Sequence, residues 1–516
     1  MSLLNRYRRS LKRRRNIRWA GKDLTRPAQI SVLQPAIRMT ETFYELMDDP
    51  SHADIMRISP AGGAGQRDSD IQTKPSDKHG NRQNTRRQID AHPFFLPAAS
   101  PEDLDAAARA IALYTRHHFG FMTRPVDYKA SFLALLEKNS RFFGPFAENA
   151  RKIHRRLVHD LPYVCHAFVA PPPFGTTPGP EPLRLGLRIE ERREDGIIVS
   201  GMKAIATAAM IAEEVFVRDH LEAGEDLEVL SFLVPLSTPG LRIVATAPTY
   251  VNWQFMDLHE VTDEPCEIES RCLSALPAYL EENDSLLVFS RVFIPEDRIL
   301  SCGKMKFESY RDQMKGFVPR AQLHGLIRAI VKLDVLGGLV KQAGRYLTPG
   351  ARKGLEEALA DLLVTQNALE GLKMRMIEDA YPLPEGHVVP HPETAASSQI
   401  FMSETLQALL VQIEDLLAGV ITALPIRPDD ISLAELEQQW GAARADIDDL
   451  YHYHRVVSAL RLMLAEGFGR RQLRFERNYL GSARRMRTLL LALASGSGAL
   501  ARQVEYADLM LSSTPN

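Results

Sequence analysis

Three polar side chains in the first third of the chain could do acid–base or electrostatic chemistry: Arg124, Tyr128 and His166. A guanidinium stays charged and offers several directed donors, an imidazole exchanges a proton near neutral pH, and a phenol hydroxyl donates a hydrogen bond. Tyr128 follows Arg124 at a spacing that would place both on one helix face, but Pro125 disturbs that geometry. Taken alone, an arginine before proline is usually a surface or capping residue. A histidine beside a cysteine in an apolar stretch is usually a core residue, so residue type alone assigns no role.

Other motifs that could bind metals or phosphates fail when their spacing is checked. The stretch GGAG at residues 62–65 is not followed by Gly-Lys-Ser/Thr, so it is not a phosphate loop. His452 and His454 stand two apart on an expected helix and cannot face one metal ion. Residues 446–449 carry aspartates but lack the glycine and closing glutamate of a calcium loop. The cysteines lack paired C-x-x-C spacing and are too few for a disulfide framework; they are Cys165, Cys266, Cys272 and Cys302. The sequence therefore predicts no metal site and a reducing cytoplasm.

Length and charge limit the class of protein. A chain of 516 residues is too long for one ordinary core, so two to four domains are expected. A hydrophobic content of 45% with 25% charged residues is typical of a soluble globular protein. The net charge of −2 gives no general attraction to nucleic acid, and no 18-residue apolar run predicts a membrane span. The basic residues between Arg6 and Arg18 are not followed by an apolar segment, so they do not form a secretory signal. We expect them to form a solvated positive surface, with an RNA- or lipid-binding arm as the less favoured alternative.

The first 159 residues are expected to form a helical domain. A short extended piece at residues 16–19 precedes helices at about 37–47, 103–118, 128–139 and 146–159. Ser100 or Asp103 is a suitable N-cap for the second of these helices, with a proline at its start. Residues 60–92 are glycine-rich and then strongly polar, which predicts a long loop.

The pattern changes to that of β-structure between residues 160 and 303. Leu185, Leu187 and Ile189 alternate with polar residues, and Asp195-Gly196 is a typical hairpin turn before a return strand. Similar patterns predict strands at 229–234, 241–245 and 286–294. We therefore expect a central β domain.

Residues 304–516 are expected to form a helical bundle. Helices are predicted at about 322–341, 354–380, 395–423, 433–466, 482–495 and 499–510. Apolar residues cover most of the surface of the first of these, which places it at the centre of the bundle. The order of helical domain, β domain and helical bundle gives an α+β class with segregated layers.

Six short motifs narrow this class to one family. They are GFMTRPVDYKA at 120–130, CHAFVAPP at 165–172, DGIIVSGMKAIAT at 195–207, END with VFIP at 282–284 and 292–295, RAIVKLD at 328–334, and GFGRRQL with NYLG at 467–473 and 478–481. In this order they resemble the 4-hydroxyphenylacetate 3-hydroxylase family, the large oxygenase component of FADH2-dependent monooxygenases. The chain departs from the family at Arg471 and Gln472, where the common pattern has His and Glu. Its polar insertion at 66–90 is also longer than the family leads us to expect.

The resemblance implies an acyl-CoA dehydrogenase-like fold: an N-terminal helical domain (1–159), a central β-barrel-like domain (160–303) and a C-terminal helical bundle (304–516). It also implies reduced FAD supplied by a separate flavin reductase, which need not dock because reduced FAD can diffuse. The reduced flavin and O2 form a C4a-hydroperoxide that transfers oxygen to a phenolic substrate, ortho to its hydroxyl. Relatives of this fold commonly form homotetramers. Neither nucleic acid nor a membrane is an expected partner.

The resemblance also implies roles for individual residues. A free phenol has a pKa of about 10, and a nearby cation such as Arg124 favours the more reactive phenolate. His166 would accept the phenol proton and Tyr128 would add a hydroxyl donor. The expected flavin contacts are His166, Ala167, Phe168, Val169 and Thr207. Arg328 and Arg470, with its neighbour Arg471, are candidates for flavin phosphates, subunit contacts or exposed salt bridges.

Two alternatives remain open at this stage. 4-Hydroxybutyryl-CoA dehydratase resembles the same family but needs an iron–sulfur cluster, for which this chain lacks closely spaced cysteines. A flavin-binding or scaffold protein that kept the fold and lost the chemistry is the second alternative. The combined presence of Arg124, Tyr128 and His166 disfavours the second.

Overall fold

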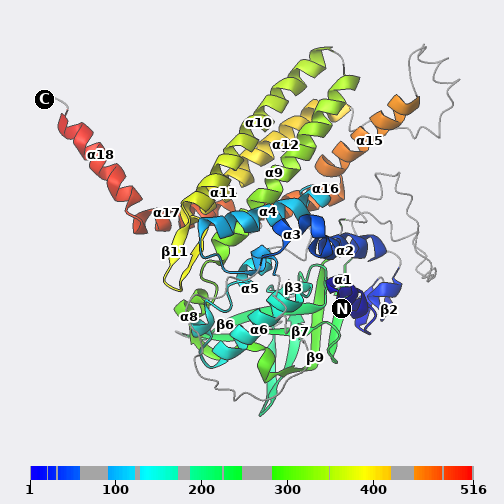
Figure 1. Cartoon of the computed structure of the whole chain (residues 1–516), viewed down its shortest axis with the longest axis vertical. Helices are drawn as coiled ribbons and strands as arrows, with labels where there is room; N and C mark the ends of the chain where they lie inside the picture. Colours follow the sequence, from blue (N-terminus) through cyan, green and yellow to red (C-terminus); the bar gives the residue numbers. More distant parts are fainter. Residues whose placement is uncertain are drawn as a thin grey trace, which may run out of the picture.

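The computed structural model places the β-sheets at one end of the molecule, the long helices of the bundle at the other, and the first helices alongside (Figure 1). It describes residues 2–19, 21–30, 33–58, 91–121, 128–171, 186–223, 226–246, 280, 282–347, 349–419, 447–478 and 481–513. Arg124, most of the expected polar loop at 60–92, Cys266 and Cys272 lie outside the described residues. The predicted α+β class with segregated layers is confirmed.

The N-terminal region contains the expected helices and two that the sequence did not predict, α1 (Leu3–Leu11) and the short α3 (Ala53–Met56). The bounds are α1 (Leu3–Leu11), α2 (Gln34–Asp48), α4 (Pro101–His117), α5 (Tyr128–Leu133) and α6 (Ala147–Asp160). Ser100 caps α4 as expected, because its hydroxyl accepts a hydrogen bond from the Asp103 N–H at 3.4 Å. α1 is amphipathic and buries Tyr7 and Leu11.

The expectation that the basic N-terminus is a solvated surface is wrong for two of its arginines. Arg15 is only 5% exposed and donates to the carbonyl of Met210 at 2.8 Å. Arg6 pairs with Glu213 at 2.6 Å. These partners are far away in the sequence, so the sequence pattern could not reveal that the two arginines bind to other parts of the folded chain.

The β domain consists of two sheets. The first has strand order β2 (Lys22–Leu24), β1 (Asn16–Trp19), β8 (Leu241–Ala245), β9 (Ser285–Pro295), β5 (Gly196–Lys203) and β4 (Arg188–Arg193). The second has the order β10 (Ile299–Lys306), β7 (Asp226–Pro235), β6 (Glu214–Ala223) and β3 (Val164–Ala167). The sheets face each other across a shared core, in which Phe232 of β7 meets Phe289 of β9 edge-on at 6.0 Å. The described strands of the β domain therefore form a two-sheet sandwich, where the family resemblance led us to expect a barrel-like domain. A separate hairpin in the C-terminal region pairs β11 (Tyr381–Leu383) with β12 (His387–Val389).

The N-terminal strand β1 belongs to this β layer, because it pairs in parallel with β8, with Ile17 opposite Ile243. The hairpin expected at Asp195-Gly196 joins β4 to β5. β6, which the sequence did not predict, is central in the second sheet.

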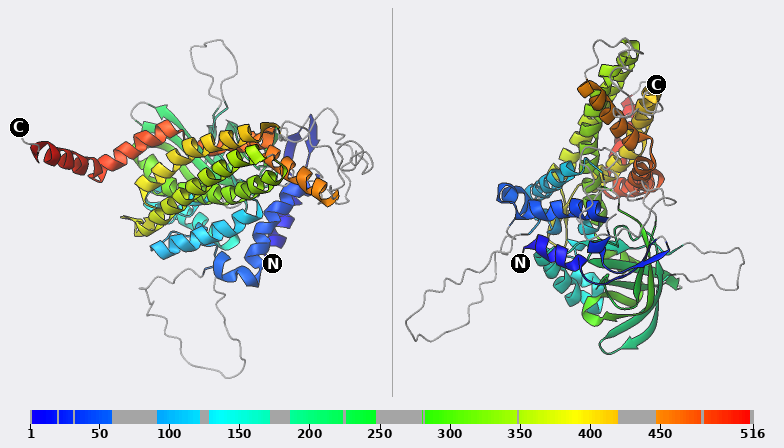
Figure 2. Two further views of the ribbon diagram at one scale, coloured as in Figure 1. Left: turned by 90° about the horizontal axis from the view of Figure 1, so that it is seen from above. Right: turned by 90° about the vertical axis from the view of Figure 1, so that its right-hand side faces the viewer.

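The C-terminal bundle is built around α9 (Phe317–Ala343), which is buried over most of its surface as its apolar pattern predicted. The other described α-helices of this region are α8 (Phe307–Asp312), α10 (Pro349–Glu378), α11 (Pro392–Phe401), α12 (Gln407–Leu416), α15 (Ile447–Leu464), α16 (Gly467–Asn478), α17 (Ala483–Gly496) and α18 (Ala499–Ser513). A π-helical turn at Met402–Leu406 separates α11 from α12 within the helix expected at 395–423. α17 leads out of the bundle, and α18 projects away from the rest of the molecule (Figures 1 and 2).

Candidate functional site

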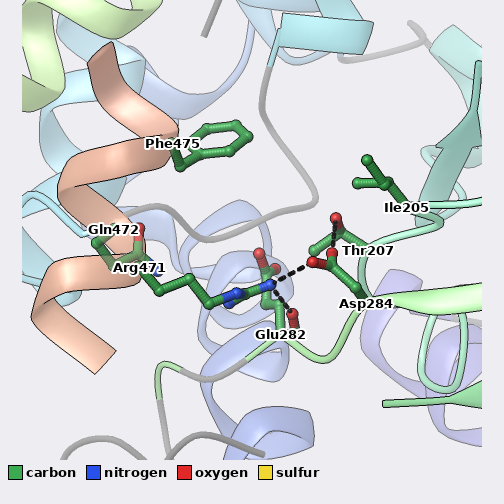
Figure 3. Close-up of a pocket in the computed structure, with 7 residues that line it drawn as sticks. All are labelled: Ile205, Thr207, Glu282, Asp284, Arg471, Gln472 and Phe475. Carbon is green, nitrogen blue, oxygen red and sulfur yellow. Dashed lines mark hydrogen bonds and ion pairs between the residues drawn. The ribbon is translucent and has the colours of Figure 1, made fainter. Parts of the chain in front are cut away.

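A cavity of about 130 Å³ lies between the β domain and the helical bundle. Three segments line it: the loop that follows β5, the residues before β9, and α16 (Figure 3). The lining residues are Ile205, Thr207, Glu282, Asp284, Arg471, Gln472 and Phe475. Most of them belong to the third, fourth and sixth sequence motifs, so the fold brings together motifs that are far apart in the sequence.

The backbone around Thr207 is fixed on both sides. The N–H of Ala206 donates to the carbonyl of Ser285, and that of Ala208 to the carbonyl of Asn283, each at 2.9 Å. Ile205 and Ala208 have positive φ angles of 56° and 64°. A β-branched residue rarely adopts this conformation, and such backbone strain is often stored at functional sites. The surrounding hydrogen bonds therefore hold Thr207 in one position at the wall of the cavity.

A short polar network joins the three lining segments (Figure 3). The Thr207 hydroxyl donates to Asp284 Oδ1 at 2.5 Å. Arg471 pairs with Asp284 Oδ2 at 3.0 Å and donates to the carbonyl of Glu282 at 3.1 Å. The Glu282 carboxylate in turn accepts from the Tyr163 hydroxyl at 2.9 Å. Arg471, which departs from the family pattern, therefore ties α16 to the β domain.

Helix α16 is held in place by contacts with other sequence motifs. Phe468 packs on Phe121, with their ring centroids 5.3 Å apart. Lys332 of α9 is buried and forms an ion pair with Glu476. Burial lowers the pKa of the Lys332 ammonium, and Glu476 partly offsets this effect. The first, fifth and sixth motifs therefore meet on one side of the cavity.

Gly120 shows how closely the first motif approaches α9. Its φ angle is +75°, and a Cβ at this position would lie 2.5 Å from the backbone nitrogen of Lys332. Only glycine satisfies both the left-handed conformation and the close approach. This contact fixes the start of the segment that contains Arg124.

His166 and the residues after it lie beside the loop that carries Thr207. His166 is on β3, only 6% exposed, and its ring lies 5.0 Å from that of Phe168. The N–H of Ala204 donates to the carbonyl of Val169 at 2.7 Å. Lys203 Nζ donates to the carbonyl of Phe168 at 2.8 Å. The expected flavin segment His166, Ala167, Phe168 and Val169 is thus bonded to the strand end that leads to Thr207.

The other candidates are placed differently. Arg328 is 2% exposed on α9 and does not line the described cavity. Together with burial, it helps to hold the pKa of His118 well below its usual value. Arg470 is exposed and pairs with Glu414 on α12. Tyr128 begins α5, but its side chain, like the whole of Arg124, lies outside the described residues.

Glu282, Asp284 and Gln472 stand in the sequence motifs, but the sequence assigned them no roles. Phe475 lies outside the motifs and was not predicted as a site residue. The only available signal was membership of a motif or closeness to one. That Asp284 and Arg471 pair with each other could not be read from the sequence, because they come from different domains.

Comparison with known proteins supports the family resemblance that the six sequence motifs indicate. The chain matches the family models "4-hydroxyphenylacetate 3-hydroxylase N terminal" over residues 67–301 and "4-hydroxyphenylacetate 3-hydroxylase C terminal" over residues 313–508. The chain belongs to the 4-hydroxyphenylacetate 3-hydroxylase family. The family expected from the six motifs is therefore confirmed.

One curated relative is the (3S)-3-amino-3-(3-chloro-4-hydroxyphenyl)propanoyl-[peptidyl-carrier protein SgcC2] monooxygenase of Streptomyces globisporus. It is 26% identical over 94% of this chain and 86% of its own length. Among solved structures, the oxygenase component of 4-hydroxyphenylacetate 3-monooxygenase complexed with FAD aligns with a TM-score of 0.75 at 21% identity, over 98% of this chain and 99% of that chain. An archaeal 4-hydroxybutyryl-CoA dehydratase from N. maritimus has a TM-score of 0.74 at 13% identity, over 100% of this chain and 95% of that chain. The two solved structures show that the fold is shared by enzymes with different chemistry.

None of the helices in the described part of the chain combines the length and the apolar character needed to cross a membrane.

Proposed function

We propose that the chain is the oxygenase component of a two-component, FAD-dependent monooxygenase that hydroxylates a phenol ortho to its hydroxyl group. The observation that carries this proposal is the cavity at which the Thr207 loop, the Glu282–Asp284 segment and α16 meet, beside the strand of His166. Family membership and a relative named as a monooxygenase of a hydroxyphenyl substrate support it.

The residues at the cavity fit a flavin ring. Phe475 and Ile205 supply apolar surface for a flat ring, whereas Thr207 and Gln472 supply polar groups for its edge. Reduced FAD, when bound, supplies the activation of O2 and the electrophilic oxygen. The protein orients this group, excludes water and prepares the phenol.

Preparation of the phenol is assigned to Arg124 and His166, with Tyr128 as an additional donor. A phenolate is a better nucleophile than a phenol, and a guanidinium next to the oxygen favours the charged form. His166 accepts the phenol proton. This assignment rests on the match of these residues to the family motifs and on the position of His166 next to the Thr207 segment.

A reductase-coupled assay tests the proposal. The full chain is mixed with NADH, FAD, a general flavin reductase and a panel of phenols, and products are examined by mass for the gain of one oxygen atom. Product is expected only when the reductase is present. Rapid NADH oxidation by the chain alone would contradict the two-component assignment. Tight binding of reduced FAD without oxygenation of any phenol would favour a scaffold role.

The dehydratase alternative fits the described cysteines poorly. Cys165 lies on β3 and Cys302 on β10, which are the opposite edges of the four-stranded sheet. Strands are spaced about 4.8 Å apart, so roughly 14 Å separates these edges, too far for two ligands of one cluster. An iron assay on the pure protein checks this conclusion, and stoichiometric iron would overturn it.

The partners follow from the proposed reaction. A flavin reductase supplies reduced FAD, either by docking or through free diffusion. We also propose a homotetramer, because α17 and α18 expose apolar side chains that the described monomer does not cover: Leu491, Val504, Tyr506, Leu509, Met510 and Leu511. A cytoplasmic location is proposed from the cysteine content.

A further inference from the structure

The hydroxyl of Thr207 has a single proton, and the positions of its neighbours determine to which of them it is donated. Thr207 Oγ1 lies 2.5 Å from Asp284 Oδ1, while the other oxygen of Asp284 is paired with Arg471 at 3.0 Å (Figure 3). An ionised carboxylate has only acceptor sites. Thr207 must therefore be the donor in this bond.

A hydroxyl that has donated its proton can only accept from a second partner. We propose that Asp284, held in place by Arg471, is a positioning residue that makes Thr207 an obligate acceptor toward the cavity, and that this selects reduced over oxidised flavin. This inference rests on the proposed function. Reduction adds a proton to a ring nitrogen that is a bare acceptor in oxidised flavin. The reduced ring can donate to Thr207, whereas the oxidised ring would place two acceptors against each other.

The surroundings leave Thr207 little freedom to change its role. Its side chain is only 5% exposed, and the backbone on either side is bonded to the segment that carries Asp284. Arg471 is anchored a second time by the carbonyl of Glu282. A mismatched pair of acceptors in a buried position is costly because water cannot easily repair it. The direction of one hydrogen bond is therefore expected to affect flavin affinity measurably.

Asp284→Asn reverses that direction without changing the shape of the side chain. The amide has one acceptor oxygen and one donor NH2 group. The oxygen will face the Arg471 guanidinium, because an NH2 group there would oppose another donor. The NH2 group then donates to Thr207, and the hydroxyl proton of Thr207 is freed to point into the cavity. The variant should therefore favour an acceptor in the ligand, as oxidised flavin offers.

The test measures the equilibrium affinity of the full chain for reduced FAD, under anaerobic conditions, and for oxidised FAD. The wild type should bind the reduced form more tightly. Asp284→Asn should lower the ratio of the affinity for reduced FAD to that for oxidised FAD by about tenfold or more. Reduced FAD should bind more weakly and oxidised FAD more tightly. Thr207→Val should also lower the ratio, and adding Asp284→Asn to it should have no further effect. Thr365→Val is the matched control, because Thr365 is equally buried but bonded to Asp361 within α10.

The outcomes separate this inference from the proposed function. An unchanged affinity ratio in Asp284→Asn or in Thr207→Val, with both flavin forms bound, overturns the role of Asp284 and leaves the monooxygenase assignment standing. Failure of the wild type to bind either form overturns the proposed function itself. Thermal unfolding of each variant establishes that it is folded. If Asp284→Asn does not fold, Thr207→Val alone still decides the outcome.

Discussion

In the proposed reaction, the side chain of His166 determines whether activated oxygen reaches the phenol or is lost as peroxide. His166 lies on β3, beside the strand end that leads to Thr207, and it is almost fully buried. In the proposed reaction His166 would deprotonate the substrate but would not be needed for the reaction of reduced flavin with O2. The two steps can therefore be separated by substitution.

His166→Ala is expected to uncouple the enzyme. Reduced flavin should still be consumed, hydrogen peroxide should accumulate, and product formation should fall by about 10²–10⁴-fold, the usual loss for an aligned general base. The measurement is product and peroxide formed per NADH in the reductase-coupled assay. His220→Ala on β6 is the control, because His220 is exposed, its ring contacts Tyr310, and neither residue lines the described cavity. Wild-type coupling in His166→Ala would show that the phenol loses its proton elsewhere.

Another histidine links stability to pH. His92 is fully buried, and burial lowers its pKa from 6.5 to about 3, so the folded protein holds the ring neutral. The unfolded chain binds a proton below about pH 6.5, whereas the folded chain does not. The contribution of His92 is therefore fully present above pH 6.5 and is lost as the pH falls toward 3.

His92→Asn should reduce this acid sensitivity. The slope of the unfolding free energy against pH should fall by the equivalent of up to one bound proton, which is about 1.4 kcal/mol per pH unit. Asparagine keeps an acceptor for the Phe94 N–H that His92 now caps. Denaturant unfolding between pH 7 and pH 4 measures the slope. An unchanged slope in His92→Asn would contradict the argument.

At the scale of elements, sequence patterns found most helices because their apolar spacing is local information. They missed β6, in which Glu214, Arg218 and Asp219 interrupt the apolar pattern. The structure holds these charges by contacts with distant residues, such as Arg156 with Glu214 and Lys203 with Asp219. A charged residue that forms an ion pair with a distant part of the chain is predicted from the sequence to be exposed. The helix α1 was not expected for the same reason, because its arginines pair with residues outside the helix.

The close approach of Gly120 to the backbone of α9 gives a test of how the elements pack. Gly120→Ala would force a Cβ to within 2.5 Å of the Lys332 backbone, in a conformation that alanine avoids. We expect a loss of stability on the order of 1–3 kcal/mol. We also expect a higher KM for the phenol, because Arg124, the proposed partner of the phenol, follows four residues later in the sequence. Thermal unfolding and KM for the phenol measure the two effects.

Gly338→Ala on the same helix is the matched control. Apart from the chain neighbours of Gly338 and the nearby backbone of α9 itself, no described atom lies within 4 Å of a Cβ at this position. Replacing an unhindered glycine in a helix should raise stability by roughly 0.5–1 kcal/mol. If both variants behaved alike, the contact of Gly120 with α9 would not be what fixes the first motif.

At the scale of the whole molecule, the order of helical domain, β domain and bundle was visible in the sequence, but the way these parts share one site was not. Thr207 and the His166 segment were anticipated from family motifs. The Asp284–Arg471 pair, the shared wall formed by Phe475, and the N-terminal strand β1 in the central sheet depend on chain segments that meet only after folding. Sequence patterns predict helices and strands one at a time, but they do not predict which elements lie next to each other after folding.

The projecting C-terminal helix provides the last test, which concerns assembly. α18 lies away from the rest of the described molecule and exposes Tyr506 at 75% and Met510 at 67% (Figure 2). A helix that exposes this much apolar surface needs a covering partner, and a second copy of the chain is the one proposed here. Deletion of residues 499–516 should convert the homotetramer into smaller species in light scattering, and Met510→Glu should weaken assembly in the same direction. Glu505→Gln, on the same helix, changes a charge without changing the apolar surface and should leave the mass unchanged. A monomeric wild type at micromolar concentration, or a deletion that stays tetrameric, would show that α18 does not hold the subunits together.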